Sequence, residues 1–255
     1  MEGATGWLPL LALSLMRPLG ALLLLPMFGS AALGGSLLRN GLALALAAPV
    51  LAAGAALPVP SGFALICALA CEFAIGLVIS FCAAIPFWAV DCAGYIIDTM
   101  RGASMASALN PALGSPSALV GILFSQALGV LFLIGGGFHQ FLTALYRSYR
   151  FLPPGGSAFM RIDVPAFIIG QWQLLFELGL GFAMPAMIIM LLVDLALGFV
   201  NRSAPQLNVF FLSMPIKSVL GLLMLLLVLN YAFAPLLARM RDFASLFVPL
   251  WSGAG

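Results

Sequence analysis

Charged side chains are scarce in this chain, and only 7% of its 255 residues are Asp, Glu, Lys or Arg. A soluble domain typically carries about 25%, so the composition excludes an ordinary water-soluble globular protein. The formal net charge is only +2, and the basic residues form no block. A nucleic-acid partner would require such a block, so we expect no nucleic-acid binding.

Histidine and cysteine are also sparse. His139 is the single histidine, and the four cysteines Cys67, Cys71, Cys82 and Cys92 lie in or beside one apolar run. Cys67 and Cys71 share a helix face, but no histidine or second cysteine pair completes a metal-binding set. We therefore expect packing thiols, no metal and no cofactor. For His139 we expect a capping or boundary hydrogen bond.

Motifs of catalysis and energy coupling are missing from the sequence. It contains no G-x-x-x-x-G-K-[ST], G-x-S-x-G or H-E-x-x-H, so it encodes no recognisable nucleotide-driven motor, and one histidine cannot serve several catalytic sites. The residues before the first apolar run include Glu2 but no Lys or Arg, so we expect no cleavable leader. The composition predicts a non-enzymatic protein of transport or assembly.

Long apolar runs make up most of the chain, which is 64% hydrophobic. Runs of this length predict membrane-spanning helices, so we expect an all-α, polytopic membrane protein with one helical domain over residues 1–255. The runs lie near residues 7–28, 41–58, 63–90, 118–142, 164–200 and 203–238. The candidate loops are 29–40, 57–62, 91–116, 146–165 and 201–208.

The fifth run, residues 164–200, is too long for one straight span, which needs about 20 residues. Glu177 and Pro185 interrupt it, and a proline removes one hydrogen bond from a helix. We expect either a kinked helix or a helical hairpin. The 27 glycines and 17 prolines of the chain favour close, bent helices in a crowded bundle.

A polar stretch follows the third run and contains Asp91, Asp98 and Arg101. On a helix Asp91 and Asp98 lie two turns apart on one face, and Asp98 reaches Arg101 at a spacing of three residues. One interpretation is a structural ion pair at a membrane boundary. The other is a polar surface that docks a neighbouring subunit or lines an aqueous path.

The next segment combines two prolines with a glycine and cannot continue a helix. Non-helical backbone at membrane depth is tolerated only against protein or a water-filled cavity. The segment is therefore either a surface turn or a loop that obstructs a pore. It extends to Pro116, and its candidate plug residues are Asn110, Pro111, Ala112, Leu113, Gly114 and Ser115.

Carboxylates also lie within the apolar runs, at Glu72, Glu177 and Asp194. We expect them to form hydrogen bonds or ion pairs between subunits, and a proton relay is the alternative. Three methionines of the fifth run recur every third residue on a broad helix face. They either pack in the core or form a flexible seal around a passing polypeptide. They are Met184, Met187 and Met190.

A polar segment also separates the last two apolar runs. It begins at Asp194, includes the core Asn201-Arg202-Ser203-Ala204-Pro205-Gln206-Leu207, and ends at Lys217. A charge at the centre of a bilayer costs about 2.5–3.5 kcal/mol, so we expect protein rather than lipid to face this segment. The candidates for a subunit interface are Asp98, Arg101, Asp194, Asn201, Arg202, Gln206 and Lys217.

That core segment resembles the characteristic sequence of the FliR/SctT family of flagellar and injectisome export-gate subunits. Arg17 with Pro26, the stretch from Gly94 to Ala103, and Gly137-Phe138-His139 fit the same family in order. Arg101 and Lys217 resemble the injectisome branch, because flagellar relatives tend to be uncharged there. One departure is Asn110, where the family often has Asp.

The resemblance implies an inner-membrane subunit built of kinked helical hairpins, which helps to form and close the pore of a type III secretion system. The implied partners are FliP/SctR-like and FliQ/SctS-like subunits, a larger export-apparatus protein, unfolded exported polypeptides and the lipid bilayer. It also implies that residues 110–115 plug the pore. The alternatives are the flagellar version of the subunit, or an ion-coupled transporter of small solutes that uses Glu177 and Asp194.

Overall fold

The computed structural model describes residues 2–29, 35–53, 60–103, 118–155, 163–204, 206 and 208–252. Every regular element in these ranges is a helix, which confirms the all-α prediction. The main helices are α1 (Glu2–Leu23), α2 (Ser36–Ala53), α3 (Phe63–Met100), α5 (Leu119–Ile134), α6 (Gly137–Phe151), α7 (Val164–Ser203) and α8 (Val209–Arg241). Three short helices complete the described elements: η1 (Pro26–Phe28), η4 (Phe243–Phe247) and α9 (Val248–Ser252).

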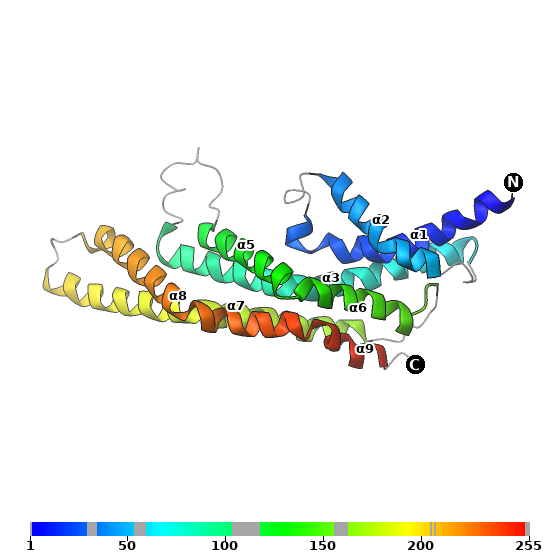
Figure 1. Cartoon of the computed structure of the whole chain (residues 1–255). Helices are drawn as coiled ribbons and strands as arrows, with labels where there is room; N and C mark the ends of the chain where they lie inside the picture. The colour runs from blue at the N-terminus through cyan, green and yellow to red at the C-terminus, as the bar shows by residue number, and fades with distance from the viewer. Residues whose placement is uncertain are drawn as a thin grey trace. The chain divides into compact units, whose positions relative to one another are not determined.

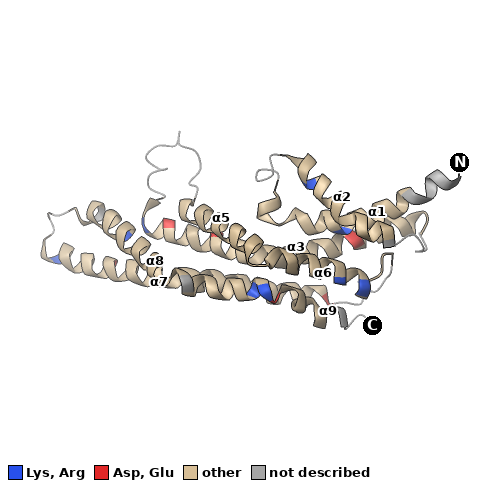
Figure 2. Cartoon of the chain, viewed as in Figure 1, with Lys and Arg blue, Asp and Glu red and all other residues tan. Residues whose placement is uncertain are grey.

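Three described helices are long and apolar enough to cross a membrane: α3, α7 and residues Phe211–Leu229 of α8. A fourth span results if α5 and α6 count as one broken helix, whereas the apolar parts of α1 and α2 are shorter. The break between α5 and α6 falls at Gly136, whose φ of +83° favours glycine. Charged residues are widely spaced along these helices (Figure 2).

Several predicted boundaries are wrong, and α2 and α6 extend into the predicted loops 29–40 and 146–165. The fifth apolar run is one 40-residue helix, α7, that continues through Pro185, so the hairpin alternative fails there. The hairpin is instead formed by α7 and α8, which lie side by side (Figure 1). The predicted loop 91–116 also starts too early, because α3 continues to Met100. The helix α3 ends two residues before Gly102, whose φ of +86° favours glycine.

The chain divides into two compact units. Unit 1 comprises Met1–Ile85, Phe132–Trp172 and Arg239–Gly255, and unit 2 comprises Pro86–Leu131 and Gln173–Ala238. The helices α3, α5, α7 and α8 contribute residues to both units. A single domain over the whole chain therefore stays a prediction.

Unit 1 is built around a close crossing of α1 and α3. A Cβ atom on Gly20 would lie 2.5 Å from the carbonyl oxygen of Phe73, and one on Gly76 would lie 2.2 Å from that of Arg17. Only glycine allows this approach of two backbones. Aromatic rings of α6 and η4 fill the adjacent core, where the tilted rings of Phe141 and Phe243 lie 6.3 Å apart between centroids.

Unit 2 has its own core, in which α5, α7 and α8 meet through three phenylalanines. The Phe124 ring lies edge-on to those of Phe182 and Phe233, at 5.2 and 6.1 Å between centroids. A second glycine contact brings α3 against α5, because a Cβ atom on Gly94 would lie 2.2 Å from the Cα atom of Gly121. This contact fixes the end of α3 beside the start of α5.

Candidate functional site

Four charged residues of unit 2 gather at the end of α3, and we call them the stem cluster: Asp98, Arg101, Asp194 and Lys217. At the C-terminal end of α3, the Nη2 atom of Arg101, which follows the helix, lies 2.6 Å from Asp98 Oδ1. Asp98 is buried, and its Oδ2 accepts a hydrogen bond of 3.1 Å from the backbone N–H of Val120. The Asp98 carboxylate thus satisfies a free N–H in the first turn of α5 and complements the dipole of that helix.

Lys217 completes the stem cluster from α8. Its Nζ lies 2.6 Å from Asp194 Oδ1 on α7 and donates to the carbonyl oxygen of Met100 at 3.4 Å. That carbonyl is at the C-terminal end of α3, where a cation is favourable. The stem cluster contains two acids and two bases, so its charges balance. It joins four helices: α3, α5, α7 and α8.

Asp98 and Arg101 of the stem cluster precede the segment 104–117. Arg101 comes just before this segment, and Val120, which donates to Asp98, comes just after it. The Asp98 carboxylate therefore joins the two stems of the segment, by which we mean the end of α3 and the start of α5. The predicted plug residues 110–115 lie outside the described residues, so their role stays a prediction.

The structure changes the interpretation of the predicted subunit interface. Asp98 and Arg101 pair with each other, as the spacing predicts, and Asp194 pairs with Lys217 of the same chain. These four residues thus have charge partners inside unit 2, and their place at a subunit interface stays a prediction.

The remaining interface candidates, Asn201, Arg202 and Gln206, form what we call the tip. Asn201 and Arg202 end α7, Gln206 follows in the turn before α8, and all three side chains are exposed. Among the described residues, Arg202 has no ion-pair partner. The tip therefore keeps the free polar groups that a subunit interface needs.

The three methionines of the predicted pore seal do not share one environment. Met190 is fully buried, and a Cβ atom on Gly221 of α8 would lie 3.4 Å from its sulfur. Met184 is 52% exposed, and Met187 is half-buried. Core packing is therefore the role of Met190, and Met184 and Met187 stay candidates for a seal.

A second polar site, in unit 1, surrounds the fully buried Arg17 on α1. Its Nε and Nη2 donate to the two carboxylate oxygens of Glu72 at 2.8 and 3.0 Å. Nη1 donates to Ser148 Oγ and Nη2 to the Leu152 carbonyl oxygen, both at 2.9 Å. The Tyr149 ring lies 4.0 Å from the guanidinium carbon. Because guanidinium is planar and stays charged when buried, this arginine cluster joins α1, α3 and α6.

Sequence reasoning missed the arginine cluster, although its signal was present. Arg17 and Glu72 are lone opposite charges inside two apolar runs, and each would be costly without the other. We expected Glu72 to pair with another subunit, and its partner is instead in the same chain.

The other polar candidates are less constrained. Glu177 is exposed on α7 and accepts a hydrogen bond of 2.8 Å from Gln173. His139 is exposed in the first turn of α6, whose N-cap is Gly136 rather than a polar side chain. Cys92 is exposed while Cys82 is buried, so Cys92 departs from the expected packing thiols. In the part of the chain that the structure describes, no group of His, Cys, Asp and Glu could hold a metal ion.

Comparison with known proteins matches the family model described as "Bacterial export proteins, family 1" over residues 8–243. The chain is 45% identical to "Secretion system apparatus protein SsaT" of Salmonella typhimurium, over 89% of each chain. It is 38% identical to "Yop proteins translocation protein T" of Yersinia pestis, over 95% of this chain and 96% of that one. "Flagellar biosynthetic protein FliR" of Bacillus subtilis is 31% identical over 64% of this chain and 63% of its own.

Proposed function

This chain belongs to family 1 of the bacterial export proteins, and we propose that it is a membrane subunit of the export gate of a type III secretion system. The observation that carries this function is the similarity, over almost the whole chain, to proteins named as components of secretion apparatus. The injectisome branch is favoured over the flagellar branch, because the flagellar relative matches less of the chain at lower identity.

The proposed role of the stem cluster is to present the segment 104–117 to the pore. Asp98 joins the two stems of this segment, and Lys217 fixes the end of α3 to α7 and α8. A closed loop on rigid stems can block a channel and still move when an exported polypeptide pushes against it. Residues 110–115 are the part of the segment that closes the pore until substrate displaces it.

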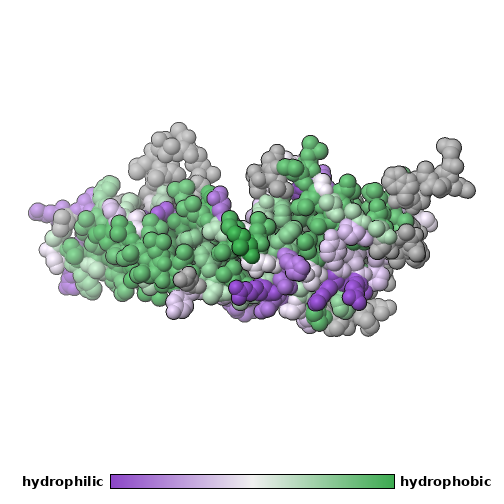
Figure 3. All heavy atoms as spheres, viewed as in Figure 1, coloured by the Kyte–Doolittle hydropathy of each residue, from purple (hydrophilic) through white to green (hydrophobic). Residues whose placement is uncertain are grey.

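The proposed surroundings are the inner membrane and a heteromeric complex within the basal body of the secretion system. Companion subunits of the FliP/SctR-like and FliQ/SctS-like types, with a larger export-apparatus protein, share the gate, and unfolded polypeptides pass through it. In support, large hydrophobic side chains are exposed along α7 and α8 (Figure 3). Such extensive apolar surface requires lipid or protein to cover it.

The structure argues against an ion-coupled transporter that uses Glu177 and Asp194 together. Both lie on the continuous helix α7, seventeen residues apart, which corresponds to about 25 Å along the axis. Asp194 is also paired with Lys217. Two carboxylates at that distance cannot share one coupling ion.

The direct test is a deletion of the gene, complemented by the wild-type chain or by a variant with residues 110–115 replaced by Gly and Ser. We expect the deletion to abolish secretion of effector proteins while motility persists. The loop variant should assemble but leak ions, measured as membrane depolarisation. Normal effector secretion in the deletion strain would refute the function, and loss of motility alone would favour the flagellar branch.

A further inference from the structure

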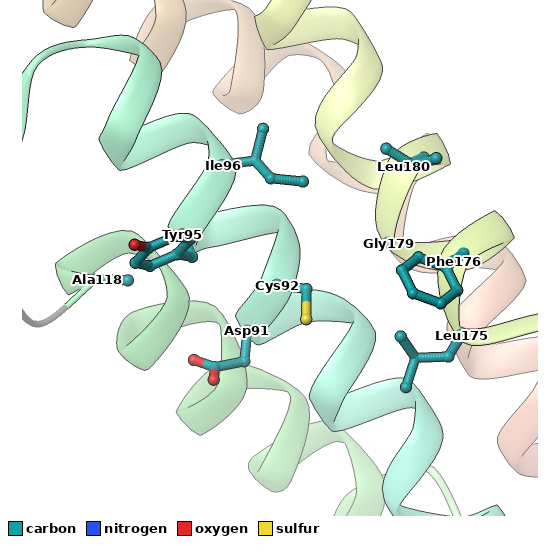
Figure 4. Close-up of a pocket in the computed structure, with 9 residues that line it drawn as sticks. All are labelled: Asp91, Cys92, Tyr95, Ile96, Ala118, Leu175, Phe176, Gly179 and Leu180. Carbon is teal, nitrogen blue, oxygen red and sulfur yellow. The ribbon is translucent and has the colours of Figure 1, made fainter. Parts of the chain in front are cut away.

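A groove opens on the surface of unit 2, with α3 as its floor (Figure 4). Ala118, just before α5, lies on one side of it, and α7 lines the other side with Phe176 and Leu180. Its volume is about 480 Å³. Gly179 lets α7 approach α3, because a Cβ atom there would lie only 3.1 Å from the carbonyl oxygen of Ala89.

Three large side chains of the groove are exposed in the chain alone. Tyr95 on the floor is 57% exposed, and Phe176 and Leu180 on the α7 side are 52% and 45% exposed. Small residues (Gly179 and Ala118) beside aromatic and aliphatic side chains are typical of a surface against which a helix packs.

One acidic group, Asp91, lines this apolar groove. Its carboxylate is exposed and, among the described residues, has no hydrogen-bond or ion-pair partner. Figure 4 shows it directed toward α5, where its Oδ1 would be 2.9 Å from a Cβ atom on Gly121. The adjoining segment 104–117 contains no Lys or Arg that could pair with it.

Lipid is a poor occupant for this groove. Acyl chains would cover Phe176 and Leu180 but leave the carboxylate of Asp91 without a partner, and an unpaired charge beside lipid is costly. A helix satisfies its own backbone hydrogen bonds at membrane depth. A long basic side chain on such a helix can reach along apolar surface to a carboxylate.

We infer that this groove receives a helix of a neighbouring subunit, and that a Lys or Arg of that helix pairs with Asp91. The inference rests on the proposed function, because it takes the neighbour to be another membrane subunit of the secretion apparatus. It adds Asp91 to the candidate interface residues, because Asp98 and Asp194 already have charge partners inside the chain.

A photo-crosslinking experiment in native membranes tests the inference. Tyr95 is replaced by p-benzoylphenylalanine, which is also aromatic, and a second probe at Leu226 on α8 serves as the control site because its side chain is also exposed. We expect the Tyr95 probe to crosslink a different membrane subunit, at a helix that carries a Lys or Arg. The Leu226 probe should not give that crosslink.

The charge is tested separately. Asp91→Asn should reduce the yield of the Tyr95 crosslink at least fivefold, whereas Asp163→Asn, at an exposed acid outside the groove, should leave it unchanged. Asp91→Lys should abolish the crosslink, and replacing the identified basic residue of the partner by Asp should restore it. As a control for folding, each variant should elute from size-exclusion chromatography at the same volume as the wild-type chain.

Three outcomes would overturn the inference while companion subunits still co-purify with the chain. The first is that the Tyr95 probe crosslinks only lipid. The second is that it crosslinks residues 104–117 or a second copy of this chain. The third is that Asp91→Asn leaves the crosslink yield unchanged. If the wild-type chain retains no companion subunit at all, the proposed function fails and the inference fails with it.

Discussion

The carboxylate of Asp98 accepts a hydrogen bond of 3.1 Å from the backbone N–H of Val120, which lies 22 residues further along the chain. The same carboxylate forms an ion pair with Arg101 at the end of α3. A single side chain thus connects the residues on either side of the segment 104–117. This segment contains two prolines, four serines and one asparagine but no charged residue.

Asp98 is expected to matter far more to stability than Asp194. Asp98→Ala removes a buried acceptor and leaves Arg101 without its partner, at a cost of about 3 kcal/mol. Asp194→Ala breaks an ion pair whose carboxylate side chain is 46% exposed, so it should cost about 0–1 kcal/mol. Thermal unfolding followed by size-exclusion chromatography measures both, and equal losses would contradict the assigned burial.

The arginine cluster of unit 1 predicts strong coupling between Arg17 and Glu72. Arg17→Met or Glu72→Met alone leaves one buried charge unpaired and should cost about 3–5 kcal/mol. The double variant should lose much less than the sum, because neither charge remains. Arg17→Lys should also destabilise, since lysine cannot form the bidentate pair. Additive losses in unfolding measurements would show that the two charges act independently.

The glycine contact between α3 and α5 makes a steric prediction. In Gly94→Ala the new Cβ atom would lie 2.2 Å from the Gly121 backbone, so the helices must separate, and we expect a lower yield of folded protein. Gly181→Ala is the matched control, because a Cβ atom at Gly181 on α7 has nothing within 4 Å. Comparable yields for both variants, measured by fluorescence-detected chromatography, would refute the close packing.

The tip predicts a defect in assembly without a defect in folding. Arg202 is exposed and has no ion-pair partner in the described part of the chain. Arg202→Ala should therefore leave thermal stability within about 0.5 kcal/mol of wild type while lowering the yield of the complex and effector secretion. Arg241→Ala, at another exposed arginine, is the control. Wild-type complex yield in Arg202→Ala would remove the tip from the interface.

The sequence predicts contacts within one helix better than contacts between helices. The Asp98–Arg101 pair follows from a spacing of three residues, because helix geometry alone brings such residues together. The pairing of Arg17 with Glu72, 55 residues apart, depends on how α1 crosses α3. Lys217 and Asp194 likewise meet only because the last two apolar runs form a hairpin.

Boundaries failed where an apolar pattern ended before its helix did. The third run stops near residue 90, but α3 continues to Met100, since the polar residues that follow, such as Asp98, pack against α5 instead of forming a loop. Pro185 favoured a break in the fifth apolar run, but the 40-residue helix α7 continues through it. Tertiary packing can support a proline inside a helix when its neighbours satisfy the freed carbonyl groups.

The most direct test of the export-gate assignment is affinity purification of the tagged chain from its native membrane, followed by mass spectrometry of the proteins that stay bound. The account predicts recovery of the small companion export-gate subunits, of the injectisome rather than the flagellar type. A monodisperse chain that retains no other subunit would contradict it.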